Sequence, residues 1–159
     1  MRRKHQGLVA ELEALPPVKK DFSTPEGAIL CLEATYPKED LEAAVNCHDF
    51  ETDARLYLRD AGYSASELEE LLPKFTEVME TTFRKVMGPG KWPTCWNKAK
   101  SYFVKREAFA EGIVIVSEIT VGPDGSLFRQ RIIVSKTRNG WRVVRPLIDG
   151  HENGPIKGI

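Results

Sequence analysis

A cysteine, a histidine and an aspartate stand side by side at Cys47, His48 and Asp49, in the stretch NCHDFE. These residue types can supply the nucleophile, the base and the orienting carboxylate of a covalent catalyst. The members of such a triad must hydrogen-bond to one another, whereas consecutive residues of a helix do not face each other. We therefore predict that Cys47 is buried at a helix end, that His48 lies in a break and that Asp49 caps the next helix.

Metal-binding and nucleotide-binding patterns are absent from the sequence. His5, His48 and His151 are too widely spaced for a zinc motif, and the cysteines have no metal-ligand spacing. There is no P-loop and no Gly-x-Gly-x-x-Gly fingerprint. The Gly-Pro-Gly at 88–90 follows a predicted helix instead of opening one, so it indicates a helix end and not a phosphate loop. We predict no catalytic set, no metal site and no cofactor.

The composition is typical of a globular domain with a sizeable core. Of the 159 residues, 42% are hydrophobic and 29% are charged. No apolar run reaches the ~18–20 residues that a membrane span needs. Glu11 and Glu13 interrupt the apolar part of the N-terminal segment, which is unlike a signal peptide. The three cysteines favour free thiols in a reducing compartment, so we expect a cytoplasmic protein with no membrane partner.

Charge is segregated along the chain although the net charge is zero. Residues 23–80 carry 14 Asp and Glu against 4 Lys and Arg, and residues 81–159 carry 14 Lys and Arg against 6 Asp and Glu. Two oppositely charged surfaces would steer a charged partner. The alternative is that the predicted helices are rich in Glu and the predicted strands are edged by Lys and Arg.

The elements that position these residues follow from periodicity and capping signals. Ser23 or Thr24 can cap the first of four main helices, and Ser23-x-x-Glu26 and Ser64-x-x-Glu67 match capping boxes. A proline after residue 36 and Gly62 stop two of these helices. The predicted helices cover 23–36, 38–47, 49–62 and 64–90.

Beyond residue 100 the apolar period changes from helical to alternating. Turn signals at Gly122–Gly125 and Asn139-Gly140 separate strands that we predict at 100–107, 111–121, 126–136 and 141–147. Helices followed by such a meander predict a single α+β domain, with helices on one face of a curved antiparallel sheet.

A four-residue turn at Gly122–Gly125 predicts the register of the two central strands. It sets Ile115 opposite Ile132, places Ile113, Ile115 and Ile119 on the core face, and turns Val116 and Glu118 outward. Pairing outward from Asn139-Gly140 places Arg145 on the core face. There it needs a charged partner, unless a β-bulge turns it outward.

The order of elements and the run TPEGAILCLEATYPKEDLEAAVNCHDFETDARLYL resemble the nuclear transport factor 2-like superfamily, the cone-shaped α+β fold shared with ketosteroid isomerases. Within it, the chain looks most like the immunity proteins of bacterial polymorphic toxin systems that use this fold. The resemblance covers about residues 23–147. It leaves an N-terminal arm or helix, 1–22, and a flexible tail, 148–159, outside the domain.

The resemblance implies an immunity protein that binds and neutralises a cognate protein toxin without catalysis, cofactor or nucleic acid. A homodimer through the sheet face is a further expectation. The alternative is a ketosteroid isomerase-like enzyme or a small-ligand-binding module of the same fold. The residue types nearest to the isomerases' tyrosine and acidic residues are Tyr36, Asp40, Tyr57 and Glu118.

Two surfaces could bind a toxin through charged anchors. The helical half offers the acidic residues Asp53, Asp60, Glu67, Glu69 and Glu70. The outer sheet face offers Arg129, Arg131 and Arg142. We favour the acidic surface, because the resemblance implies a toxin that acts on nucleic acid and presents a basic active site.

Overall fold

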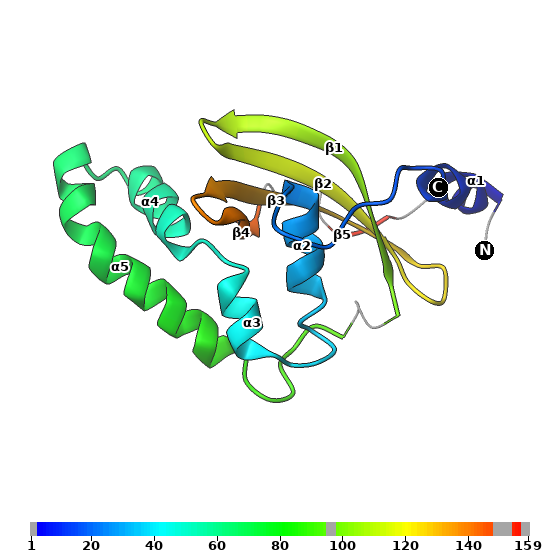
Figure 1. Ribbon diagram of the computed structural model, residues 1–159, viewed down its shortest axis with the longest axis horizontal. Coiled ribbons are helices and arrows are strands. Elements are labelled where there is room, and N and C mark those ends of the chain that lie inside the picture. Colours follow the sequence, from blue (N-terminus) through cyan, green and yellow to red (C-terminus); the bar gives the residue numbers. More distant parts are fainter. Residues whose placement is uncertain (1–2, 95–97, 148–153, 157–159) are drawn as a thin grey trace.

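Helices occupy the first half of the chain and an antiparallel sheet the second (Figure 1). The computed structural model describes residues 3–94, 98–147 and 154–156. The helices are α1 (Arg3–Glu13), α2 (Pro25–Glu33), α3 (Leu41–Asn46), α4 (Phe50–Asp60) and α5 (Ala65–Val86). The strands are β1 (Lys100–Ala110), β2 (Ile113–Val121), β3 (Leu127–Thr137), β4 (Gly140–Pro146) and β5 (Gly154–Pro155). The predicted α+β order of helices before a curved antiparallel sheet is confirmed.

Capping side chains fix where the helices begin. The Asp49 carboxylate accepts the backbone N–H of Thr52 and starts α4, and Ser64 and Glu67 form the predicted capping box of α5. The predicted box at Ser23 is wrong, because Thr24 caps α2 by accepting the N–H of Gly27 at 3.0 Å. Helix α2 also ends three residues before the predicted boundary, at Glu33.

The sheet has the order β1-β2-β3-β4, and β5 pairs with β3 beyond the end of β4. Figure 1 shows the sheet curving over α2, which packs across β2, β3 and β4. Helices α4 and α5 pack on each other beside the β4 end of the sheet. The space between this helical pair and the sheet becomes the candidate site.

The predicted register of β2 and β3 is wrong by one residue. Ile115 lies opposite Ile133, and Val116 lies opposite Ile132. The reason is a five-residue connection: the N–H of Gly122 donates to the carbonyl of Ser126 at 2.8 Å, and Val121 pairs with Leu127. The prediction that Val116 and Glu118 turn outward is wrong, because they lie opposite Ile132 and Gln130 and are fully buried. Ile115 and Ile119 are buried on the opposite face of the sheet, in agreement with the prediction that they belong to the core.

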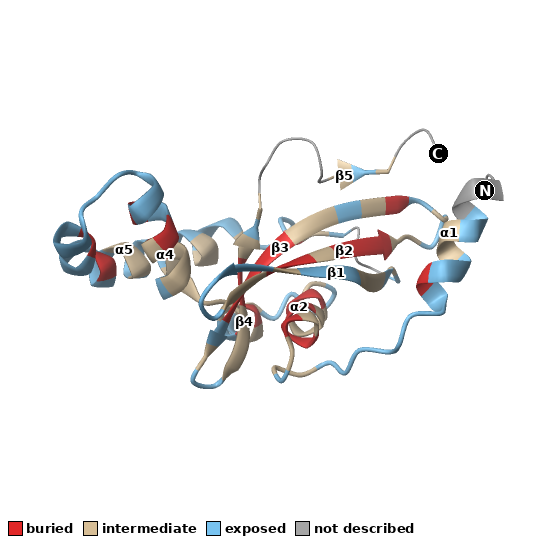
Figure 2. Cartoon of the chain, turned by 90° about the horizontal axis from the view of Figure 1, so that it is seen from above, coloured by how far each residue is buried: buried red, intermediate tan, exposed pale blue. Residues whose placement is uncertain are grey.

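Apolar side chains from both faces of the sheet enter the core. Towards α2, the buried set is Val116, Ile132, Val134 and Val143 with Ile29 and Leu32. On the other face, Ile115, Ile133 and Val144 pack with Leu56 of α4, and Leu12 of α1 covers Ile119 and Leu127. Figure 2 shows these buried positions along α2 and the central strands. The sheet is therefore covered on both faces, with α1 and α2 on opposite sides.

Arg145 has both features that the sequence suggested as alternatives, a charged partner and a neighbouring β-bulge. A β-bulge at Val144 sets Arg145 opposite Ile133 and Val143 opposite Val134. The Arg145 side chain is 36% exposed, and its Nε lies 3.3 Å from Asp53 Oδ1. Its Nη2 lies 3.9 Å from Asp60 Oδ2. The arginine is thus half-buried with two carboxylates.

Part of the C-terminal segment is held on the sheet. Gly154 and Pro155 lie opposite Arg129 and Phe128, and the N–H of Ile156 donates to the carbonyl of Leu127 at 2.9 Å. The other positions of the tail predicted to be flexible, including His151, lie outside the described residues. Within the described ranges, no helix is both long and apolar enough to span a bilayer.

Candidate functional site

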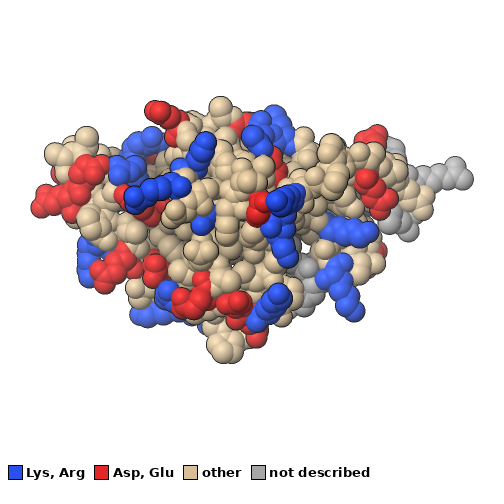
Figure 3. All heavy atoms as spheres, in the orientation of Figure 1, with Lys and Arg blue, Asp and Glu red and all other residues tan. Residues whose placement is uncertain are grey.

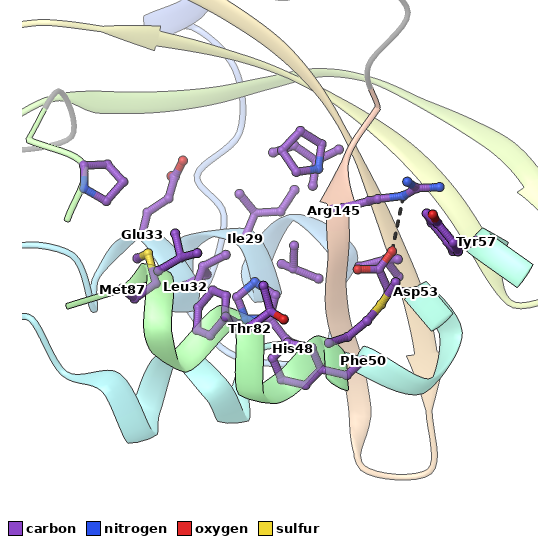
Figure 4. A pocket seen from close by; sticks show the side chains of 18 of the residues that line it. Ile29, Leu32, Glu33, His48, Phe50, Asp53, Tyr57, Thr82, Met87 and Arg145 are labelled. Atoms are coloured by element: carbon purple, nitrogen blue, oxygen red, sulfur yellow. Dashed lines mark ion pairs between the residues drawn. The ribbon is translucent and has the colours of Figure 1, made fainter. Parts of the chain in front are cut away.

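A cavity of about 710 Å³ opens between α2, the α4–α5 pair and strands β3 and β4. Its walls are mainly aliphatic and aromatic side chains. Helix α2 contributes Ile29 and Leu32, the sheet contributes Ile132 and Val143, and α5 contributes Phe83 among others. Figure 4 shows Ile29, Leu32, His48 and Met87 among the side chains around this space.

The second half of α5 bounds one side of the cavity. Leu68 and Leu72 are buried against Ala54 and Leu58 of α4. Further along, the apolar face of α5 lines the cavity with Phe75, Val78, Met79, Phe83 and Val86. Phe75 and Met79 also pack against the α4–α5 cluster, and Phe83 packs against the cluster between α2 and the sheet. The sequence shows a continuous apolar face along the predicted helix 64–90. Leu68 and Leu72 on this face are buried, Phe75, Met79 and Phe83 are partly buried, and Leu71, Val78 and Val86 are exposed.

His48 and two phenylalanines form the floor of the cavity. The His48 ring centroid lies 4.4 Å from that of Phe83 and 5.3 Å from that of Phe50. His48 Nδ1 lies 2.7 Å from the carbonyl oxygen of Ala44 and donates to it, which leaves Nε2 as an acceptor. Burial lowers the pKa of His48, so the imidazole is neutral at pH 7.

The neighbours of His48 are structural, as predicted. Cys47 is 3% exposed, and burial raises the pKa of its thiol to about 12. The Asp49 carboxylate accepts the hydroxyls of Thr52 and Ser135, both at 2.6 Å. The backbone of Cys47 and Asp49 bonds to Val143 on β4. The stretch NCHDFE is therefore not a triad. It adds a short bridge to the edge of the sheet and places the His48 ring in the wall of the cavity.

The cavity has polar groups on two sides. Figure 4 shows Glu33 on one side and the Asp53–Arg145 ion pair with Tyr57 on the other, with Ile29, Leu32 and His48 between them. Glu33 accepts the Ser101 hydroxyl at 2.8 Å. Burial raises the pKa of Asp53, although the charge of Arg145 opposes this rise.

The four residues nearest to the isomerase pattern are not gathered at one place. Tyr36 and Tyr57 line the cavity. Glu118 is fully buried behind Gln130, whose Nε2 donates to it at 2.8 Å. Asp40 is exposed and caps α3 by accepting the N–H of Ala43. The two tyrosines belong to the site, and the two acidic residues lie outside its wall.

The acidic residues predicted to bind a partner are partly occupied within the chain. Asp53 and Asp60 flank Arg145, and Asp53 lines the cavity. Glu69 forms an ion pair with Arg55, and Glu67 belongs to the capping box of α5. Glu70 is exposed on the same helix.

The predicted basic residues are placed differently from one another. Arg129 is exposed on β3. Arg131 is 17% exposed and lies 3.4 Å from Glu107. The Arg142 guanidinium stacks 3.7 Å above the ring of Phe22. Figure 3 shows acidic and basic side chains interspersed on the face in view, so segregation along the sequence does not produce two separate surfaces there.

Comparisons with known proteins give little guidance. No protein-family model and no curated protein matches the chain. A solved structure of a phospholipid-binding protein from Ralstonia solanacearum, in complex with a phospholipid, shares 15% sequence identity and superposes with a TM-score of 0.45. The alignment covers 79% of this chain and 75% of that chain.

Proposed function

We propose that this chain is a binding module of the nuclear transport factor 2-like cone class that takes a small, mainly apolar molecule without chemical turnover. The observation that carries the proposal is the cavity of about 710 Å³ between the helices and the sheet. Its size falls within the roughly 300–1,000 Å³ of small-molecule sites, which are apolar with a few polar groups.

The cavity wall explains why an apolar ligand is favoured. Filling the space would remove apolar side chains of α2 and α5 from water, at a gain of roughly 25 cal/mol per Å². Three titratable wall residues have partners within the chain: Glu33 is bonded to Ser101, His48 Nδ1 to a backbone carbonyl, and Asp53 is paired with Arg145. These contacts support binding without turnover.

Filling the cavity with protein tests this function. Thr82 lines the cavity from α5, so Thr82→Trp should occupy the ligand's space. Thr81 is its exposed neighbour and is not part of the wall, so Thr81→Trp is the matched control. The probe is the uncharged fluorophore N-phenyl-1-naphthylamine, titrated by fluorescence.

We expect the Thr82 variant to bind the probe at least ~10-fold more weakly, a loss of ~1.4 kcal/mol, and the Thr81 variant to bind it normally. The proposal fails if the unaltered protein does not bind the probe. It also fails if the two variants lose affinity equally, because binding would then not depend on the cavity.

We propose toxin neutralisation, the role implied by the sequence resemblance, as a second candidate. The observation that favours it is a row of exposed apolar residues on α5, Leu71, Val78 and Val86, on a helix that also carries the exposed Glu67, Glu70 and Glu77. Apolar anchors beside charges are typical of transient interfaces. The direct test is binding to the product of the adjacent upstream gene, where a cognate toxin would be encoded.

A further inference from the structure

Two buried polar atoms at one end of the cavity have unused hydrogen-bonding capacity. Asp53 Oδ1 and Arg145 Nε are both buried from solvent, and neither has a hydrogen-bond partner among the described residues. They lie 3.3 Å apart as an ion pair, but their geometry is not that of a hydrogen bond. A buried polar atom without such a partner costs about 1–3 kcal/mol, so a ligand that supplies one is favoured.

A hydroxyl group satisfies both atoms at once. A carboxylate oxygen accepts hydrogen bonds, and a guanidinium Nε–H donates one. Because neither atom is accessible to solvent, a hydroxyl group reaches them as the two side chains move apart. It can then donate its proton to Asp53 Oδ1 and accept the Arg145 Nε–H with a lone pair. An ether or a ketone can only accept, and would leave the carboxylate oxygen unsatisfied.

The local charges favour a neutral ligand. Asp53 and Arg145 neutralise each other at the cavity wall, so a charged ligand would add an unbalanced charge in a largely apolar space. An anion would also meet the carboxylate of Asp53, and a cation would meet the guanidinium of Arg145. A hydroxyl adds no charge.

The Glu33 side of the cavity does not compete for the ligand's hydroxyl group. Glu33 already accepts a hydrogen bond from Ser101 at 2.8 Å, and it lies across the apolar middle of the cavity from Asp53 (Figure 4). The end of the cavity at Asp53 and Arg145 therefore requires a hydrogen-bond partner. The wall between this end and Glu33 is apolar.

We propose that the cavity binds an uncharged amphipathic molecule with a terminal hydroxyl group, and that this hydroxyl bridges Asp53 and Arg145. The inference rests on the proposed small-molecule function and specifies its ligand class. The ligand lies with its apolar body along Ile29, Leu32 and Phe83.

A ligand series on the unaltered protein tests the proposal. The competitors are 1-decanol, 1-methoxydecane, decanoate and decyltrimethylammonium, each used to displace N-phenyl-1-naphthylamine. They share one alkyl chain and differ in the head group. We expect 1-decanol to bind ~10-fold more tightly than 1-methoxydecane, which lacks the donor, and more tightly than either ion.

Substitutions of Asp53 and Arg145 test where the head group of the ligand binds. Asp53→Asn should reduce the preference for 1-decanol over 1-methoxydecane, and Arg145→Met should do the same while improving binding of decyltrimethylammonium. Asp60→Asn is the matched control: Asp60 pairs with the same arginine at 3.9 Å, but it is 69% exposed and is not part of the cavity wall. We expect its ligand preferences to be unchanged.

The outcomes separate the two levels of the hypothesis. If neither the probe nor any competitor binds, the small-molecule function itself is wrong. If the probe binds and the four competitors are equivalent, or an ion binds best, only the hydroxyl assignment is wrong. Equal effects of the Asp53 and Asp60 substitutions would also overturn it. A variant that no longer folds leaves the ligand series on the unaltered protein decisive.

Discussion

The protonation state of His48 affects the stability of the fold. Its ring contacts those of Phe50 and Phe83, its Nδ1 is bonded to Ala44, and burial lowers its pKa. A positively charged ring would be poorly solvated here. The floor of the cavity therefore requires the neutral imidazole.

Lowering the pH should destabilise the protein through this residue. In the unfolded chain the histidine pKa is about 6.5, and in the folded protein it is lower, so below this pH the unfolded state binds more protons. The stabilisation is fully present above about pH 6.5 and is lost as pH falls towards the folded pKa. Urea denaturation at pH 7.5 and 5.5 should show a smaller pH dependence for His48→Leu than for the unaltered protein. Identical pH dependence would assign the effect to other groups.

The first turn of α2 is fixed by the segment that precedes it. A Cβ atom added at Gly27 would lie 2.2 Å from the carbonyl oxygen of Asp21 and 2.6 Å from that of Lys19. Both atoms are backbone, so neither can rotate away. This close approach sets how residues 19–21 cross the helix that forms one wall of the cavity.

Gly27→Ala should therefore cost roughly 1–3 kcal/mol of unfolding free energy, as overpacking does. Gly7→Ala on α1 is the matched control, because a Cβ there would meet nothing within 4 Å. Alanine is the better helix former by about 1 kcal/mol at an exposed site, so this control should be neutral or stabilising. Thermal or urea unfolding measures both; equal effects would contradict the steric account.

Local signals predicted the elements well and their pairing poorly. Capping residues such as Asp49 and Ser64 act within one turn, so the sequence alone located the starts of α4 and α5. The β2–β3 register depended on whether the connection has four or five residues. Bonds within the connection, including Ser126 N–H to Asp124 at 3.0 Å, decide this. That one residue changed which β3 side chains lie opposite Val116 and Glu118, and both of these residues are fully buried.

The candidate site was less predictable than the fold. The broad apolar face of α5 was visible in the sequence, but an apolar face has the same pattern whether it meets another element or an open cavity. Asp53 was expected on a partner-binding surface, and its pairing with Arg145 depends on the β-bulge at Val144. Tertiary placement, and not residue type, creates the site.

At the scale of the whole molecule, charge decides between the two candidate partner surfaces. If a basic toxin binds the helical half, reversing Glu67, Glu69 and Glu70 to lysine should weaken binding far more than reversing Arg129 and Arg131 to glutamate. Association should also slow steeply with salt, because long-range attraction is screened. Stopped-flow association with the adjacent gene's product at two salt concentrations measures this.

Glu69 also pairs with Arg55, so the unfolding free energy of the triple variant must be measured beside its binding. A variant that stays folded and binds normally would exclude the acidic surface. The opposite ranking of the two variants would move the interface to the sheet.

The outer edge of β1 has a consequence for solubility. This strand pairs only with β2 among the described strands, so its other edge presents unpaired backbone groups that could recruit a strand from another chain. Two bulges leave Val104 and Phe109 out of the register, and charged side chains such as Lys105 and Arg106 lie along the strand. Bulges bend an edge, and charges oppose stacking against a second chain. The protein thus carries on β1 a built-in protection against edge-to-edge aggregation, although Val104 and Phe109 themselves are exposed and apolar.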